Sequence, residues 1–179
     1  MNAVDEDWIR RFHLSEESVC GTGVFEVRRG ERQLGRLIGM LLRFPHSSHN
    51  ADVRVDIGRS ASGAGSERWS RRIGEHRLDS VQINDDGLVR ESFGVIELRM
   101  RQSVRDGRLR LIAEGAALKV GHRRLRLPRW CAPHASGEVW APDRERGETP
   151  SFQLQVRIWV PCTGPLLSYT GHIEEVPNG

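Results

Sequence analysis

Hydrophobic and polar residues alternate with a period of two along much of this chain. Residues 52–57 alternate between Asp or Arg and Val or Ile, and residues 152–158 alternate between large apolar residues and Gln or Arg. Successive side chains of a β-strand point to opposite faces, so each run predicts a strand with one face buried. Several such runs predict an antiparallel sheet with one face turned to a core.

Further strands follow from the same pattern and from turn signals between the runs. Residues 84–87 (Asn-Asp-Asp-Gly) and 106–107 (Asp-Gly) are typical of tight hairpin turns. The predicted strands lie around 24–28, 51–58, 67–73, 77–83, 88–91, 95–104, 108–113, 116–120, 123–127, 136–141, 151–160 and 166–176. Between them, residues 58–66 and 141–150 have the composition of exposed loops.

The period changes to a helical one between residues 31 and 44. Apolar residues recur there at three- and four-residue spacing (Leu34, Leu37, Ile38, Leu41 and Leu42), and Arg32, Arg36 and Arg43 take the other side. Pro45 ends this helix. We expect its apolar face to cover the sheet, in preference to lying on a membrane surface. Residues 4–14 predict a second, short helix on the same grounds.

A sheet of about ten strands in one domain is expected to curl or to split into two layers. The predicted fold is therefore mainly β (α+β): a strongly curved antiparallel sheet or (half-)barrel with one amphipathic helix packed on it, or alternatively a β-sandwich. We expect residues 1–179 to form a single domain, with 1–20 as an N-terminal helical extension and 21–176 as the β domain.

The charged residues narrow the choice of partners only a little. The net charge is +3, and Lys119 is the only lysine among 27 cationic residues. Arginine suits phosphate binding, and residues 121–130 combine four arginines with Trp130. The arginines are nevertheless scattered along the chain, as a GC-rich coding bias would produce. We expect Leu125 and Leu127 to point to the core and the arginines to face water, which makes nucleic-acid binding an unfavoured interpretation.

Cysteine use and apolar runs bear on the compartment. The three cysteines (Cys20, Cys131 and Cys162) are far apart and show no metal-binding spacing. The longest apolar stretch, 34–42, is interrupted by Arg36 and is much shorter than the roughly 20 residues of a membrane span. The N-terminus has no signal-peptide pattern. We expect a soluble, cytoplasmic chain.

Several blocks together resemble the bacterial domain-of-unknown-function family 4166. They are residues 21–45, 68–74 (Arg-Trp-Ser-Arg-Arg-Ile-Gly), 91–94 (Glu-Ser-Phe-Gly), 125–133 (Leu-Arg-Leu-Pro-Arg-Trp-Cys-Ala-Pro) and 167–171 (Leu-Ser-Tyr-Thr-Gly). Their order and spacing match across roughly residues 20–176. The resemblance implies a bacterial domain that occurs alone or fused to larger proteins, including some with a nicotinamide-cofactor-binding, dehydrogenase-like domain. It implies no activity.

Four polar positions inside these blocks are the candidate site residues: Arg71, Glu91, Arg129 and Tyr169. Such residues form either a buried ion pair that orders the fold or a set of groups that converge on a ligand. We favour the structural role. Arg71 and Glu91 are a plausible pair across neighbouring strands.

No pattern predicts a catalytic residue, a metal site or a cofactor. His46 and His49 are the only close histidine pair and lack a third ligand. Neither a G-x-S-x-G elbow nor a complete nucleotide-binding glycine motif is present.

Three functions are compatible with these features. The leading hypothesis is a non-enzymatic domain that binds a hydrophobic or lipid-like small molecule in the concave face, which requires a cavity of about a few hundred Å³. The alternative is an accessory module for a separate or fused NAD(P)-dependent oxidoreductase, with an exposed apolar patch. An enzyme ranks third and requires at least two of Arg71, Glu91, His122, Arg129, His134 and Tyr169 in one cleft.

Overall fold

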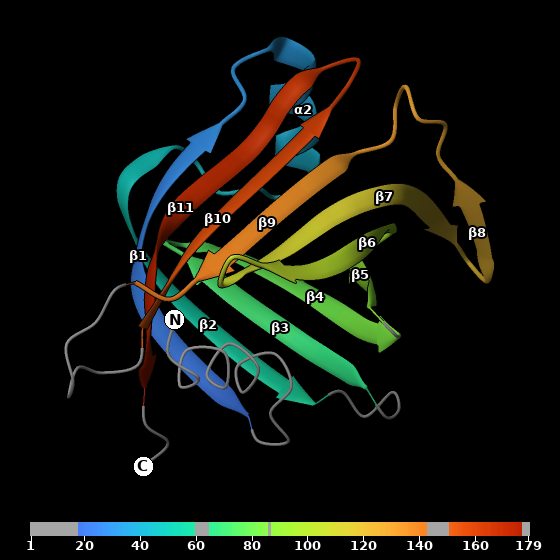
Figure 1. The fold of residues 1–179 in the computed structure, drawn as a ribbon. Helices are drawn as coiled ribbons and strands as arrows, with labels where there is room; N and C mark the ends of the chain where they lie inside the picture. The colour runs from blue at the N-terminus through green and yellow to red at the C-terminus, as the bar shows by residue number, and fades with distance from the viewer. Residues whose placement is uncertain (1–17, 60–64, 86, 143–150, 177–179) are drawn as a thin grey trace.

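The computed structural model describes residues 18–59, 65–85, 87–142 and 151–176 and contains eleven antiparallel strands and one helix in these ranges (Figure 1). The strands are β1 (Val19–Arg29), β2 (Ser48–Arg59), β3 (Ser66–Ile73), β4 (His76–Asp85), β5 (Leu88–Phe93), β6 (Ile96–Arg105), β7 (Arg108–Val120), β8 (Arg123–Arg126), β9 (His134–Trp140), β10 (Ser151–Val160) and β11 (Gly164–Val176). The helix is α2 (Gln33–Leu41). The predicted helix at 4–14 lies outside the described residues, as do most of the two predicted loops.

Ten of the strands close into a barrel, which confirms the barrel over the sandwich. Their order is β6-β5-β4-β3-β2-β1-β11-β10-β9-β7, and β6 pairs in turn with β7. Closure leaves no free edge on these ten strands, which removes the main route to edge-to-edge aggregation. β8 pairs with the end of β7 and projects away from the barrel (Figure 1).

Strand β7 corrects one prediction, because the segments predicted at 108–113 and 116–120 form a single strand. A register shift between Arg99 and Met100 of β6 lets β7 continue through Glu114 and Gly115. β7 is therefore long enough to pair with β9 near its start and with β8 near its end. The pair Glu114-Gly115 is typical of a turn, but in this structure a β-bulge accommodates it within the strand.

The side chains that point into the barrel form two hydrophobic clusters. The larger cluster is centred on β1, β2, β10 and β11, and Phe25, Leu167 and Ile173 are each only 1% exposed. The smaller cluster joins β5, β6 and β7 to the segment before β9, around Val89, Leu98 and Met100.

Helix α2 lies at one end of the barrel, but the predicted orientation of its apolar face is wrong. Ile38 and Leu42 pack partly against the core, whereas Leu34, Leu37 and Leu41 are 51%, 61% and 81% exposed. The buried residues of this helix are glycines, Gly35 and Gly39. A glycine gives no hydrophobic signal, so the sequence pattern assigned the wrong side of the helix to the core.

Strand β8 corrects a second orientation. All four of its residues are exposed, and Leu125, predicted to face the core, is 54% exposed. Leu127, just after β8, does pack against the smaller cluster. β8 lies outside the closed ring, so neither of its faces borders the barrel interior.

None of the helices in the described ranges is both long and apolar enough to span a bilayer. Cys20, Cys131 and Cys162 are free thiols.

Candidate functional site

The barrel interior contains a cavity of about 110 Å³. Its wall is mostly apolar and aromatic, with a small polar group on one side. The polar or charged members are Arg71, Gln82, Glu91, Ser136, Glu138 and Tyr169, and the aromatic members besides Tyr169 are Phe25, Phe44, Trp69, Phe93 and Phe152. Three of the four predicted site residues, Arg71, Glu91 and Tyr169, therefore line the same space.

The centre of the polar group is a hydrogen-bonded triad of Arg71, Ser80 and Glu91. The Arg71 guanidinium donates from Nη1 to Ser80 Oγ at 2.9 Å and from Nη2 to Glu91 Oε1 at 3.0 Å. Ser80 Oγ donates to the same Glu91 oxygen at 2.7 Å. The two charged side chains are only 11% and 7% exposed, so the barrel holds a buried ion pair.

The pairing of Arg71 with Glu91 is confirmed, but the two residues are not on neighbouring strands as predicted. Arg71 lies on β3 opposite Leu78, and Glu91 lies on β5 opposite Gln82, so β4 separates them. Ser80 on β4 bridges the gap. Sequence reasoning missed Ser80 and Gln82. They alternate with the apolar residues Val81 and Ile83, so the pattern predicts that Val81 and Ile83 face the core and that Ser80 and Gln82 face water.

The environment raises the pKa of two members of the site, Arg71 and Tyr169. Burial alone would lower the pKa of Arg71, but the Glu91 carboxylate, together with smaller contributions from Tyr169 and Asp79, outweighs it, so the pKa of Arg71 is raised. Burial raises the pKa of Tyr169, and the charge of Glu91 adds to this while Arg71 opposes it. Arg71 is therefore a permanent cation and Tyr169 a neutral phenol.

Two polar side chains on the cavity wall have unused hydrogen-bonding capacity. The Tyr169 hydroxyl and the Gln82 amide form no side-chain hydrogen bond with any residue that the structure describes, although their residues are only 9% and 7% exposed. The Tyr169 ring is held by stacking on Phe25, with centroids 5.2 Å apart. The fully buried polar atoms without a partner among the described residues are Arg29 Nε, Ser66 Oγ and Arg110 Nε, so the polar atoms of Tyr169 and Gln82 are not sealed off from the cavity space.

The cavity adjoins an open pocket of about 530 Å³ beside α2, which we call the mouth pocket. The two spaces share five wall residues: Phe44, Leu78, Phe93, Leu98 and Ile158. Beyond them, the mouth pocket is bordered by Leu41 and Leu42 at the end of α2 and by the turn between β5 and β6. The two spaces therefore adjoin at a shared apolar wall.

Arg129, the fourth predicted site residue, lies elsewhere. It is exposed and lines a separate cleft of about 790 Å³ beside β8, together with Arg90, Arg126 and His134. Glu97 in this cleft is bound by Lys119 at 3.6 Å and by Arg124 at 3.4 Å. This cleft shares no lining residue with the barrel cavity, so it does not extend the barrel site.

The described residues contain no group of three or more His, Cys, Asp and Glu side chains that could hold a metal ion. His46 and His76 meet edge to face, with centroids 4.9 Å apart, and His134 stacks on Trp159. Neither His122 nor His134 lines the barrel cavity.

Comparison with solved structures finds a protein of unknown function from the DUF3598 family of Nostoc punctiforme. The likeness has a TM-score of 0.49 and 13% sequence identity, and it covers 90% of this chain. The chain spans 47% of that protein's length. No curated protein matches the sequence.

A family model supplies the classification. The model described as domain of unknown function (DUF4166) matches residues 7–173, which is nearly the whole chain. The match includes all the strands that form the barrel cavity, although it ends within β11. The chain therefore belongs to the DUF4166 family.

Proposed function

We propose that this barrel binds a small amphipathic molecule, with its apolar body in the mouth pocket and its polar group in the inner cavity. The inner cavity of about 110 Å³ is smaller than expected for a whole lipid-like ligand. It suffices for a hydroxyl, carbonyl or carboxylate group. The mouth pocket of about 530 Å³ supplies the remaining space.

The observation that carries this proposal is the convergence of polar side chains from β3, β4, β5 and β11 on one mostly apolar cavity. Tyr169 and Gln82 face the cavity and form no side-chain hydrogen bond with the described residues. Arg71 adds a guanidinium of which Nη1 and Nη2 are oriented by Ser80 and Glu91. A mostly apolar space with a few fixed polar groups is typical of a small-molecule site.

Catalysis ranks below binding. Glu91 is the candidate general base in this cavity. One of its carboxylate oxygens, Oε1, already accepts hydrogen bonds from both Arg71 and Ser80. The phenol of Tyr169 has a raised pKa and is a weak acid. These features favour fixed recognition over proton transfer.

The test uses the purified full chain and the probe 1-anilinonaphthalene-8-sulfonate, which has an apolar body and one anionic group. We expect saturable fluorescence enhancement. Tyr169→Phe should weaken binding by roughly 2- to 10-fold, as expected for one lost hydrogen bond. Native mass spectrometry of the same material should reveal any apolar molecule carried from the expression host.

Two glycine substitutions provide a cavity-filling variant and its matched control. Gly137 lines the cavity, and an added Cβ would make only ordinary contacts, at 3.9 Å, with Leu111 and Val156. Gly137→Val should therefore fill part of the cavity and reduce binding at least 10-fold. Gly58→Val adds the same side chain where nothing lies within 4 Å of the new Cβ. Equal binding by both variants would refute the inner site.

A second candidate is an accessory module for an oxidoreductase. The exposed leucines of α2 favour it, since a protein interface needs an apolar patch. Affinity purification from the native host tests it, and recovery of no dehydrogenase-like protein would count against it.

A further inference from the structure

Helix α2 presents an unusual apolar surface to the outside. Leu34, Leu37, Met40 and Leu41 are 51%, 61%, 69% and 81% exposed. Val95, in the turn between β5 and β6, is 59% exposed and borders the mouth pocket together with Leu41. We call these five side chains the apolar rim. Surface leucines are common singly, but a group around an opening marks an interaction site.

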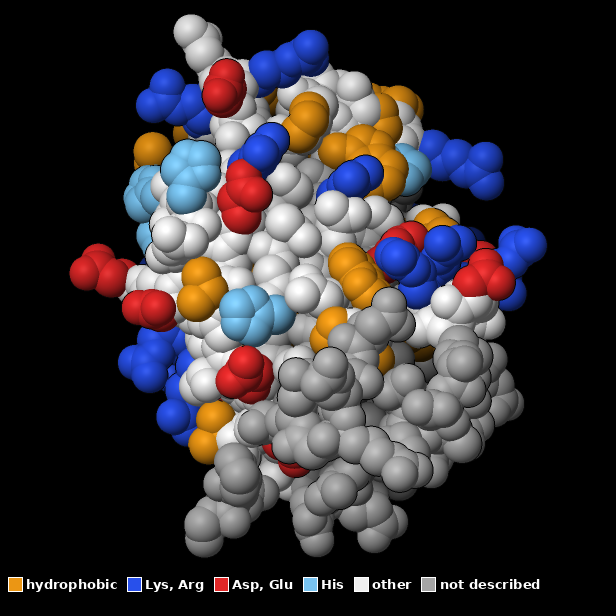
Figure 2. All heavy atoms as spheres, turned by 60° about the vertical axis from the view of Figure 1, so that its left-hand side comes forward, with side chains coloured by type: hydrophobic (Ala, Val, Ile, Leu, Met, Phe, Trp, Pro, Cys, Tyr) orange, Lys and Arg blue, Asp and Glu red, His pale blue; other side chains and the backbone are white. Residues whose placement is uncertain are grey.

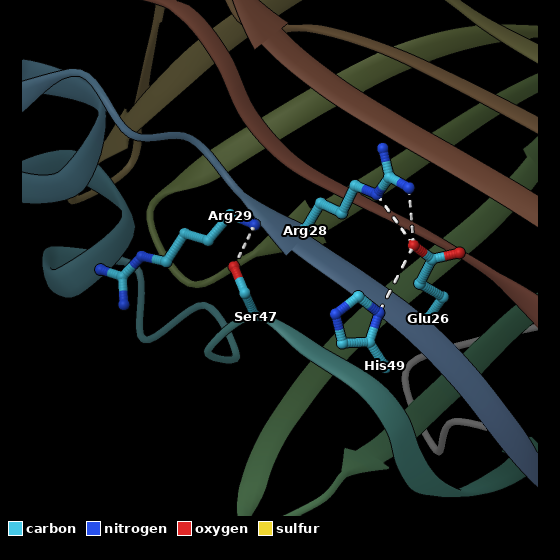
Figure 3. A network of polar contacts seen from close by, with 5 residues as sticks. All are labelled: Glu26, Arg28, Arg29, Ser47 and His49. Atoms are coloured by element: carbon cyan, nitrogen blue, oxygen red, sulfur yellow. Dashed lines mark hydrogen bonds and ion pairs between the residues drawn. The ribbon is translucent and has the colours of Figure 1, made fainter.

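The fold holds the helix in this orientation. Gly39 lies over the Arg29 side chain, where an added Cβ would be only 2.8 Å from Nε. Arg29 donates from Nη2 to the Arg36 carbonyl at 2.9 Å, and its backbone N–H donates to Ser47 Oγ at 2.9 Å. Figure 3 shows the Arg29 side chain extending from β1 towards the helix. The helix thus cannot simply turn its leucines inward.

Cationic side chains accompany the apolar rim. Arg32, Arg36 and Arg43 are exposed, and none of them forms an ion pair with a described carboxylate, whereas Arg28 is bound to Glu26 at 2.7 Å. Glu31 is the one exposed carboxylate between residues 29 and 45. In Figure 2, hydrophobic and Lys or Arg side chains lie close together at the upper end of the molecule, where Figure 1 places α2.

We propose that α2 and the apolar rim dock the barrel onto an anionic lipid surface, with the mouth pocket facing the bilayer. Leucine and methionine side chains would enter the interface while the three arginines contact phosphate groups, as in interfacial amphipathic helices. Leu41 and Val95 of the rim border the mouth pocket, so docking would let an apolar molecule pass between the bilayer and the mouth pocket without crossing water.

The charge favours a lipid surface over the other two occupants. A second copy of this chain would oppose like charges from Arg32, Arg36 and Arg43 across a two-fold axis, which costs free energy. A protein partner would need carboxylates placed opposite each arginine. The phosphate groups of an anionic bilayer can contact all three arginines, because they need no fixed spacing to do so.

The experiment is sedimentation of the full chain with vesicles. We expect binding to vesicles of phosphatidylcholine and phosphatidylglycerol in equal parts, little binding to phosphatidylcholine alone, and a decrease with rising salt. Replacing Arg32, Arg36 and Arg43 with Gln together should lower the partition coefficient roughly 100-fold. Leu37→Glu should lower it at least 10-fold.

Val104→Glu is the matched control. Val104 is 61% exposed, as Leu37 is, but lies at the β6–β7 hairpin, at the other end of the barrel. It should leave vesicle binding unchanged, and so should Tyr169→Phe, which separates docking from ligand binding. The proposal fails if the wild type does not sediment with anionic vesicles, or if Leu37→Glu and Val104→Glu lose binding equally. It also fails if the chain is a dimer that Leu37→Glu converts to a monomer.

Discussion

The two sides of the barrel interior bury very different side chains. On β10 and β11, Phe152, Leu167 and Ile173 are 3%, 1% and 1% exposed and pack against other apolar groups. On the opposite side of the ring, β4 and β5 bring Ser80 and Glu91 inward to meet Arg71 of β3. Tyr169 of β11 joins the two sides, since it stacks on Phe25 and lies in the electric field of the ion pair.

The difference shows how each side contributes. Apolar burial on β10 and β11 drives folding through the hydrophobic effect. The ion pair is expected to contribute little net stability, because removing two charges from water offsets most of their attraction. The ion pair instead places polar groups in the cavity. The β10–β11 side therefore contributes mainly to stability, and the β3–β5 side supplies the polar groups for recognition.

The largest expected effect comes from breaking the ion pair on one side only. Arg71→Met should lower the free energy of unfolding by about 3–5 kcal/mol, because Glu91 would remain buried without its cation. Urea denaturation followed by Trp fluorescence measures it. Arg77→Met is the control, since its partner Asp79 is 51% exposed, and should cost about 0–1 kcal/mol. If Arg71→Met combined with Glu91→Leu stays as unstable as the single variant, the pair itself stabilises the barrel.

Truncation on the apolar side should cost slightly less. Ile173 is 1% exposed, so Ile173→Ala should lower the free energy of unfolding by about 2–5 kcal/mol through lost burial and a new cavity. Ile112→Ala, at a side chain that is 54% exposed, should change it little. Equal losses in the two variants would show that burial of apolar side chains on β11 is not what stabilises this side of the barrel.

A close backbone contact on β11 gives a smaller effect. A Cβ on Gly171 would lie 2.1 Å from the Val24 carbonyl oxygen and 2.5 Å from Phe25 Cδ1. Gly171→Ala should therefore destabilise the barrel by about 1–3 kcal/mol, since strand pairing must shift. Gly58→Ala, with open space around it, should be neutral. Thermal denaturation by circular dichroism compares the two, and an unchanged melting temperature for Gly171→Ala would contradict the tight β1–β11 approach.

The titration of Tyr169 gives the smallest expected effect on stability. It can be followed directly because Tyr169 is the only tyrosine in the chain. Its pKa is raised in the folded barrel, so its contribution to stability is complete below the unfolded value of about 10 and is lost as pH rises above it. We expect tyrosinate absorbance in the near ultraviolet to appear at higher pH for the native than for the denatured chain. Coincident titration curves would contradict the buried, neutral phenol. Tyr169→Phe should flatten the fall in stability above that pH.

The candidate site could be predicted only in part. Arg71, Glu91 and Tyr169 stand out as polar residues within the family-like blocks, and they do line one cavity. Arg129 stands out for the same reason and lies in another cleft. Sequence proximity to a family-like block says nothing about which face of a curled sheet a side chain occupies.

The sequence by itself determined most of the strands, their hairpins and the change of period at α2, because these depend on local alternation and turn residues. It divided β7 into two segments and placed the end of the helix at Pro45, whereas the helix ends at Leu41. Only the tertiary structure decided ring closure, the bridge across β4 and the outward leucines of α2. These features arise from contacts between residues distant in sequence, such as Arg29 beneath Gly39 and Ser80 between Arg71 and Glu91. Local patterns contain no information about such long-range packing.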